Sequence, residues 1–273
     1  MLAAGTEIDR YRLEAVLGEG GMAVVWRARH LLLGSLHAIK ILRPELIHVD
    51  DVRERFLAEG RIQAQLRHPN VAAVSDLVSD AGVAGLVMEL LDGETLEERL
   101  RRGGPLRADE VAAIFGPVLD ALGEAHDRGV VHRDLKPSNL FLAARTRGRV
   151  RPVVLDFGIA KVRDDARLEA IRSGTTLHGA RMGTPAYMSP EQVRDPRAVD
   201  ARSDLFAVGA ILYEAITGAP AFPGETDHAI TERILAGHVE DPRRRVGAEL
   251  ASVADVVRRA LAVDPALRFG DAL

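Results

Sequence analysis

The spacing of the apolar residues changes near Gly93, and this change is the strongest constraint on the fold. Before Gly93, glycine-containing turns separate short β-branched and aliphatic runs at 12–17, 24–29, 36–42 and 86–91. Such runs are typical of an antiparallel sheet. One helical stretch, about 51–67, interrupts them, and Glu59 lies on its apolar stripe. The sequence therefore predicts a small sheet with one helix in the first third of the chain.

After Gly93 the apolar residues recur at three- and four-residue spacing, which predicts helices. We expect these helices at 108–128, 203–217, 226–236 and 251–262. The stretch 203–217 is apolar nearly all round and is followed by Gly218, which predicts a helix buried in the middle of its lobe. Gly116-Pro117 is expected to bend the first helix.

Composition excludes several classes of protein. Thirty-six basic and forty acidic residues leave a net charge of −4, which offers no footprint for nucleic acid. The chain has no cysteine, so disulfides and thiolate metal sites are excluded and a reducing cytoplasm is the expected location. The longest uncharged apolar run, 205–213, has nine residues, whereas a membrane span needs about 20. We therefore expect neither a nucleic-acid partner nor a membrane span.

Two features of the first lobe point to phosphate chemistry. Glycines between two strands, in the segment 17–25, would let backbone N–H groups approach phosphate oxygens, although most glycine-rich hairpins are only turns. The third position of the Gly-x-Gly-x-x-Gly pattern is Ala23. Lys40 lies between two isoleucines on the next strand and is one of only three lysines. An ammonium there could neutralise phosphate, and the carboxylate of Glu59 could hold it; ordinary surface charges are the alternative.

A run of motifs in the second lobe narrows the interpretation. The stretch 132–139 reads His-Arg-Asp-Leu-Lys-Pro-Ser-Asn, and Asp156-Phe-Gly follows seventeen residues after its end. The stretch 183–191 reads Gly-Thr-Pro-Ala-Tyr-Met-Ser-Pro-Glu. In this order, behind the glycine segment and Lys40, these motifs resemble the eukaryotic-like Ser/Thr protein kinases of bacteria. The resemblance runs from about Tyr11 to Arg268, with Ser189 where many members have alanine.

The resemblance implies an α+β, bilobal protein-kinase fold. Residues 1–10 would form a lead-in and residues 11–273 the kinase domain, with an N-lobe over about 11–91, a hinge over about 89–94 and a mainly helical C-lobe over about 95–273. The last helix of such domains usually continues past Arg268, so we expect it to be truncated here. Asp204 is expected to anchor the backbone of 132–134, and Glu191 to pair with Arg268.

By resemblance, the activity is that of a non-specific serine/threonine protein kinase, which transfers the γ-phosphoryl group of ATP to Ser or Thr hydroxyls. The cofactors implied are ATP and Mg²⁺, with Mn²⁺ as a substitute. Asp134 would accept the hydroxyl proton, Lys136 would contact the γ-phosphate, and Asn139 and Asp156 would bind the metal. Thr184 would contact Asp134 and Lys136, and Lys40 would grip the α and β phosphates. The residues expected around ATP are Leu17, Gly18, Glu19, Gly20, Gly21, Met22, Ala23, Val24, Val25, Ala38, Lys40, Glu59, Met88, Glu89, Leu91 and Phe141.

Regulation and partners follow from the same resemblance. Arg133 directly precedes Asp134, and in relatives with that pair a phosphate on the activation loop neutralises the arginine. We expect autophosphorylation at Ser173, Thr175 or Thr176, through a transient homodimer, and protein substrates carrying Ser or Thr. A pseudokinase scaffold is the main alternative, which a missing Lys, Asp or Asn would favour; all are present. Small-molecule phosphotransferases of this fold usually lack a segment like 183–191.

Overall fold

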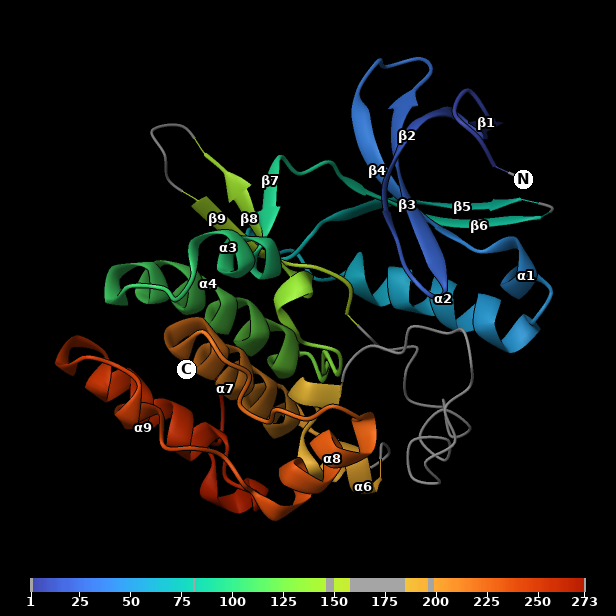
Figure 1. Cartoon of the computed structure of the whole chain (residues 1–273). Helices are drawn as coiled ribbons and strands as arrows, with labels where there is room; N and C mark the ends of the chain where they lie inside the picture. The colour runs from blue at the N-terminus through green and yellow to red at the C-terminus, as the bar shows by residue number, and fades with distance from the viewer. Residues whose placement is uncertain (1, 81, 146–149, 158–184, 196–198, 273) are drawn as a thin grey trace. The chain divides into compact units, whose positions relative to one another are not determined.

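The computed structural model describes residues 2–80, 82–145, 150–157, 185–195 and 199–272. It divides into two units, Met1–Asp92 and Gly93–Leu273 (Figure 1). The division falls inside the segment 89–94 that the resemblance predicts as the hinge.

The first unit is built on an antiparallel sheet of six strands in the order β1-β2-β3-β4-β6-β5. The strands are β1 (Glu7–Ile8), β2 (Tyr11–Glu19), β3 (Ala23–His30), β4 (Leu36–Leu42), β5 (Val74–Asp80) and β6 (Val83–Glu89). Two helices, α1 (Pro44–Ile47) and α2 (Asp50–Gln63), follow β4. The predicted strands and helix are present; α2 ends four residues before the expected position. The two edge strands were missed because β1 has two residues and β5 carries two serines and two aspartates.

Alternation along β4 decides which of its side chains face α2. Successive residues of a strand point to opposite faces of the sheet. Ile39 and Ile41 belong to an apolar cluster with Leu13, Trp26 and Val87. Leu42 belongs to a different cluster, in which Phe56 and Leu57 of α2 pack against Ala84 and Leu86 of β6. Lys40, two residues from Leu42, therefore lies on the face that α2 covers.

The second unit combines a three-stranded sheet with a helical core. Strands β7 (Gly93–Thr95), β8 (Leu140–Ala144) and β9 (Val150–Val154) pair antiparallel in that order. The helices are α3 (Leu96–Gly103), α4 (Ala108–Asp127), α6 (Pro190–Arg194), α7 (Ala201–Thr217), α8 (Asp227–Ala236) and α9 (Ala251–Ala260). The four helices predicted from periodicity are present to within a few residues at each end, and α4 continues through Pro117.

Helix α7 is the centre of this unit, as its composition predicts. It lies between α4 and α9 (Figure 1), and thirteen of its seventeen residues are buried. It starts two residues earlier than expected because the side chain of Asp200 accepts a hydrogen bond from Arg202 N at 2.8 Å and caps the helix. Gly218 ends it in the left-handed conformation, at φ 73°. Within the described ranges, no helix is long and apolar enough to cross a membrane.

Candidate active site

Lys40 and Glu59 form an ion pair within the first unit. Lys40 Nζ lies 4.0 Å from Glu59 Oε1, and the two side chains are 16% and 7% exposed. Strand β4 and helix α2 supply the two groups. The alternative of two unrelated surface charges is therefore wrong, and the pair expected from the sequence is present.

The glycine segment forms the turn between β2 and β3. Gly20 N donates to Ala23 O at 2.8 Å. A Cβ built on Gly18 or Gly21 would meet nothing within 4 Å, so these glycines leave open space beside the backbone. Ala23 begins β3 and its side chain is buried in the cluster with Leu42, which explains why a side chain is accommodated at the third glycine position. The segment has the free backbone surface that a phosphate needs.

Part of the expected adenine environment also lies together in the first unit. Ala38 and Met88 share an apolar cluster, against which Val25 packs. At the end of β6, Glu89 N donates to Ala73 O at 3.1 Å. Phe141 belongs to the second unit, where it pairs with Val153 of β9.

The loop His132–Asn139 connects α4 to β8, and Asp204 of α7 holds its backbone. Asp204 is 1% exposed. Its carboxylate accepts hydrogen bonds from His132 N at 2.8 Å and from Arg133 N at 2.9 Å, and also from His126 Nε2 at 2.8 Å. The anchoring role predicted for Asp204 is confirmed. Arg133 has φ 65°, a conformation that is rare for a residue with a bulky side chain.

The ring of His132 links this loop to the segment before Phe157. His132 Nδ1 accepts from Asp134 N at 3.3 Å, so the proton is on Nε2, which donates to Leu155 O at 2.8 Å. The ring also packs on Phe157, with centroids 4.8 Å apart. Burial lowers the pKa of His132 and outweighs the opposing effect of Asp204. A neutral imidazole is what this arrangement requires.

Two polar side chains of the loop, those of Lys136 and Asn139, converge on Asp134. Lys136 Nζ donates to Asp134 Oδ2 at 3.0 Å. Asn139 Nδ2 donates to Asp134 O at 2.8 Å and lies 3.5 Å from Oδ2. Asn139 O in turn accepts from Leu155 N at 2.8 Å, which brings Asn139 next to the segment that carries Asp156. The loop therefore places an ammonium and an amide beside one carboxylate.

The donor set at this place fits Mg²⁺. The amide nitrogen of Asn139 is engaged with the loop, so its oxygen is the atom it can offer to a cation, and Asp156 adds carboxylate oxygens. Mg²⁺ prefers such hard oxygen ligands and takes the rest of its shell from phosphates and water. No cluster of three or more His, Asp or Glu suited to a metal occurs in the part of the chain that the structure describes.

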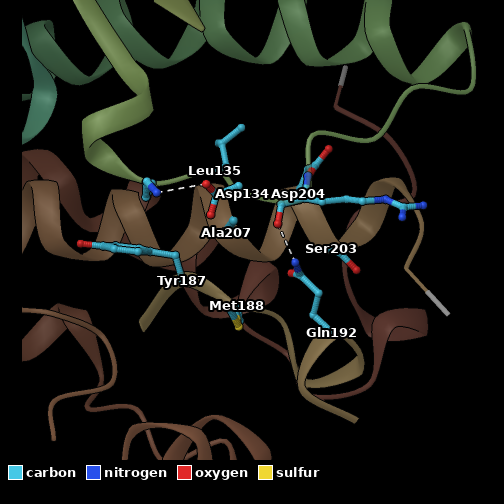
Figure 2. Close-up of a pocket in the computed structure, with 10 residues that line it drawn as sticks. Asp134, Leu135, Tyr187, Met188, Gln192, Ser203, Asp204 and Ala207 are labelled. Carbon is cyan, nitrogen blue, oxygen red and sulfur yellow. Dashed lines mark hydrogen bonds and ion pairs between the residues drawn. The ribbon is translucent and has the colours of Figure 1, made fainter. Parts of the chain in front are cut away.

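A pocket below the loop is shown in Figure 2, with Tyr187, Met188 and Gln192 on one side and α7 on the other. Tyr187 Oη donates to Glu214 Oε2 at 2.6 Å. Burial raises the pKa of Tyr187, and Glu214 raises it further. This bond ties the segment 185–188 to α7.

The pairing predicted between Glu191 and Arg268 is confirmed. Arg268 donates to both carboxylate oxygens of Glu191, at 2.7 and 2.8 Å. Burial would raise the pKa of Glu191, but hydrogen bonds from Arg268 and Ser203 and the charge of Arg268 together lower it.

Some expected site residues have no described position, and some contacts near the site were not expected. Thr184, Ser173, Thr175 and Thr176 lie outside the described residues. Two polar contacts around the loop were not foreseen, that of His126 with Asp204 and that of Gln192 with the backbone carbonyl of Arg133. His126 is a polar residue at the end of an otherwise apolar helix, which is a weak signal; Gln192 follows directly on the motif 183–191.

Comparison with known proteins decides the family. The family model of the protein kinase domain matches residues 11–272 of this chain. The chain belongs to the protein kinase family. The protein-kinase fold expected from the sequence is confirmed by similarity to the crystal structure of the Mycobacterium tuberculosis PknI kinase domain. That comparison has a TM-score of 0.73 and 28% identity, and covers 100% of this chain and 95% of that one.

Two bacterial proteins are among the relatives of this kinase-family chain. It is 39% identical over 264 residues to the serine/threonine-protein kinase pkn3 of Myxococcus xanthus, covering 95% of this chain and 47% of the relative. It is 40% identical over 239 residues to a probable serine/threonine-protein kinase, PknB, of Corynebacterium glutamicum, covering 86% and 35%. The resemblance to bacterial eukaryotic-like Ser/Thr kinases is confirmed. The chain spans less than half the length of these relatives.

Proposed function

We propose that this chain is the catalytic domain of a serine/threonine protein kinase, which transfers the γ-phosphoryl group of ATP to Ser or Thr hydroxyls of protein substrates. The observation that carries the proposal is the convergence of Lys136 and Asn139 on the carboxylate of Asp134, on a loop held by Asp204. The names of the bacterial relatives support hydroxyl rather than phenol substrates.

Asp134 is the group that receives the substrate. Its carboxylate orients the hydroxyl and accepts its proton as the oxygen attacks the γ-phosphorus and the bond to the ADP oxygen breaks. Lys136 contacts the transferred group and balances its negative charge. Bound Mg²⁺, for which Mn²⁺ can substitute, supplies charge neutralisation at the phosphate oxygens. Asn139 and Asp156 hold that ion, and Thr184 contacts Asp134 and Lys136.

The first unit supplies the nucleotide contacts in this proposal. Lys40, held by Glu59, binds the α and β phosphates, and the segment 17–25 covers them. The cluster of Val25, Ala38 and Met88 takes one face of the adenine, and Phe141 or Leu142 takes the other. Backbone groups of Glu89 and Leu91 donate to and accept from the adenine edge.

Autophosphorylation in trans is proposed as the activating step, with Ser173, Thr175 or Thr176 as acceptor in a transient homodimer. Support comes from Arg133, whose Nη1 is buried and has no hydrogen-bond partner in the described ranges. Burial lowers the pKa of Arg133 but Asp204 opposes this, and the guanidinium stays charged. A phosphate would supply both the missing acceptor and the opposite charge.

Mass spectrometry and activity test the activating step together. Active protein should carry phosphate at one of these residues. Thr175 and Thr176 are preferred by their distance from Gly183 in the sequence, so the double variant Thr175→Ala, Thr176→Ala should lose most of its activity. If Ser173, Thr175 and Thr176 carry no phosphate in fully active protein, the proposed activating step is refuted.

The cytoplasm is the proposed location of the protein.

Incorporation of labelled phosphate from ATP and Mg²⁺ tests the kinase proposal itself. Wild-type protein should label itself or a protein substrate on Ser and Thr. The variant Asp134→Asn should lose nearly all incorporation because it lacks the proton acceptor. Asp109→Asn is the matched control, since Asp109 pairs with Arg107 on the exposed surface of the same unit. A wild-type chain that binds nucleotide and transfers nothing would establish the scaffold alternative instead.

A further inference from the structure

We propose that Gln192 is a positioning residue of the active site, which holds the backbone of the catalytic loop through the carbonyl of Arg133. Gln192 lies on α6, fifty-nine residues along the chain from Arg133. Its Nε2 donates to Arg133 O at 2.6 Å. Figure 2 shows the side chain pointing from α6 toward the loop. This inference rests on the proposed kinase function and adds a residue to its machinery.

The orientation of the Gln192 amide follows from two separate contacts. Only the nitrogen end can donate to the carbonyl of Arg133. The oxygen end accepts from Ser189 N at 3.3 Å. The contacts at the two ends of the amide therefore require the same orientation. Ser189, which is buried, also accepts from Gln192 N through its hydroxyl at 3.3 Å. This reciprocal capping box leaves the side chain of Gln192 with one arrangement.

The peptide plane that Gln192 contacts is the one that carries Asp134. This plane joins the carbonyl of Arg133 to the N–H of Asp134. Its carbonyl accepts from Gln192, and its N–H donates to His132 Nδ1 at 3.3 Å. In the preceding peptide plane, the N–H of Arg133 itself donates to the carboxylate of Asp204. The plane is thus held at both ends, and Gln192 is the contact from outside the loop.

Such holding is needed because Arg133 has a positive φ of 65°. A residue with a bulky side chain is sterically disfavoured in that region, and such conformations persist where surrounding contacts impose them. If the carbonyl loses its donor, the plane can rotate, and the Asp134 carboxylate moves with it. Gln192 therefore affects the geometry of the proton acceptor rather than the binding of nucleotide.

The variant Gln192→Glu separates positioning from local helix capping. Glutamate is a preferred residue at this capping-box position, so the cap of α6 is kept. Its ionised carboxylate has no N–H to donate and repels the Arg133 carbonyl. We expect kcat to fall about 10²-fold with KM for ATP unchanged. Protonation of the introduced carboxyl restores a donor, so kcat relative to wild type should rise as pH is lowered toward about 5.

Two further variants complete the design. Gln192→Met removes both contacts and should lose kcat at every pH. Glu98→Gln is the matched control, because Glu98 holds the same position in the capping box of α3, with Thr95 as its partner. It exchanges carboxylate and amide without touching the catalytic loop, and should keep wild-type kcat.

Gln192→Glu with wild-type kcat and an unchanged pH profile would overturn the inference. So would a loss of kcat that only follows the unfolded fraction measured by circular dichroism. If the wild-type chain transfers no phosphate, the kinase proposal fails by itself. The positioning role of Gln192 is then tested by the hydrogen-exchange rates of the backbone amides of residues 132–136. Faster exchange there in Gln192→Glu than in Glu98→Gln supports the inference, and equal exchange contradicts it.

Discussion

Replacing Arg268 by methionine should destabilise the second unit strongly, because Arg268 is a buried side chain with many hydrogen bonds. Arg268 is 3% exposed. All five of its N–H groups donate, two of them to Glu191 and the others to the carbonyls of Ala262, Arg202 and Val263. Its guanidinium also lies 4.9 Å from the ring centroid of Phe206. The side chain therefore joins α6, α7 and the segment after α9.

The magnitude follows from what Arg268→Met leaves behind. Glu191 would keep a carboxylate whose side chain is only 13% exposed and whose remaining hydrogen bond from a side chain comes from Ser203 Oγ at 2.6 Å. Breaking one partner of a buried ion pair typically costs 3–5 kcal/mol, because the other charge stays buried. We expect the free energy of unfolding to fall by about 3–5 kcal/mol. Adding Glu191→Gln removes the uncompensated charge and should recover at least about 1 kcal/mol.

The loss of stability in Arg268→Met should depend on pH in a defined direction. The pKa of Glu191 is held below the ordinary value of a glutamate. In the wild type its stabilisation is therefore present above that ordinary value and is lost as pH falls through the folded pKa. In Arg268→Met, the hydrogen bonds and the charge of Arg268 no longer outweigh the burial that raises the pKa of Glu191. The carboxyl then protonates readily, and the deficit relative to wild type should shrink below about pH 5.

Urea unfolding followed by far-ultraviolet circular dichroism is the suitable assay, because the helices of the second unit dominate that signal. The only tryptophan, Trp26, lies in the first unit, so its fluorescence reports that unit separately. A loss below about 1 kcal/mol, or a double variant less stable than Arg268→Met, would refute the reasoning.

Two other perturbations test the first unit and the small sheet. Lys40→Met removes the ammonium that pairs with Glu59 and should lower turnover by at least about tenfold while Trp26 fluorescence keeps its native unfolding midpoint; turnover equal to wild type would contradict the proposed phosphate contact. Gly93→Ala should cost more than about 1 kcal/mol of stability, because Gly93 has φ 145° and a Cβ would run into the carbonyl oxygen of Leu142. Gly21→Ala, where a Cβ meets nothing within 4 Å, is its control in the same urea assay, and equal losses in the two variants would show the argument from φ to be wrong.

Periodicity predicted the long elements and failed for the short ones. Strand β4 and helices α4 and α7 carry enough apolar residues to show their spacing in the sequence. Strands β1 and β7 have two and three residues, too few for any period to appear. Helix α3 has a single buried residue, Leu96, so it shows no apolar stripe and is formed by its capping box and its packing.

The candidate site divides in a similar way. Asp134 and Asn139 stand in the motif 132–139 and Asp156 in the motif that follows it. The residues of each motif are contiguous, so the sequence alone names them. Asp204 and the pair of Glu191 and Arg268 could also be placed by their order along the chain. His126 and Gln192 could not, since each bonds to a residue 78 or 59 positions away. A hydrogen bond needs two atoms within about 3 Å, and the path of the folded chain decides which distant atoms come that close.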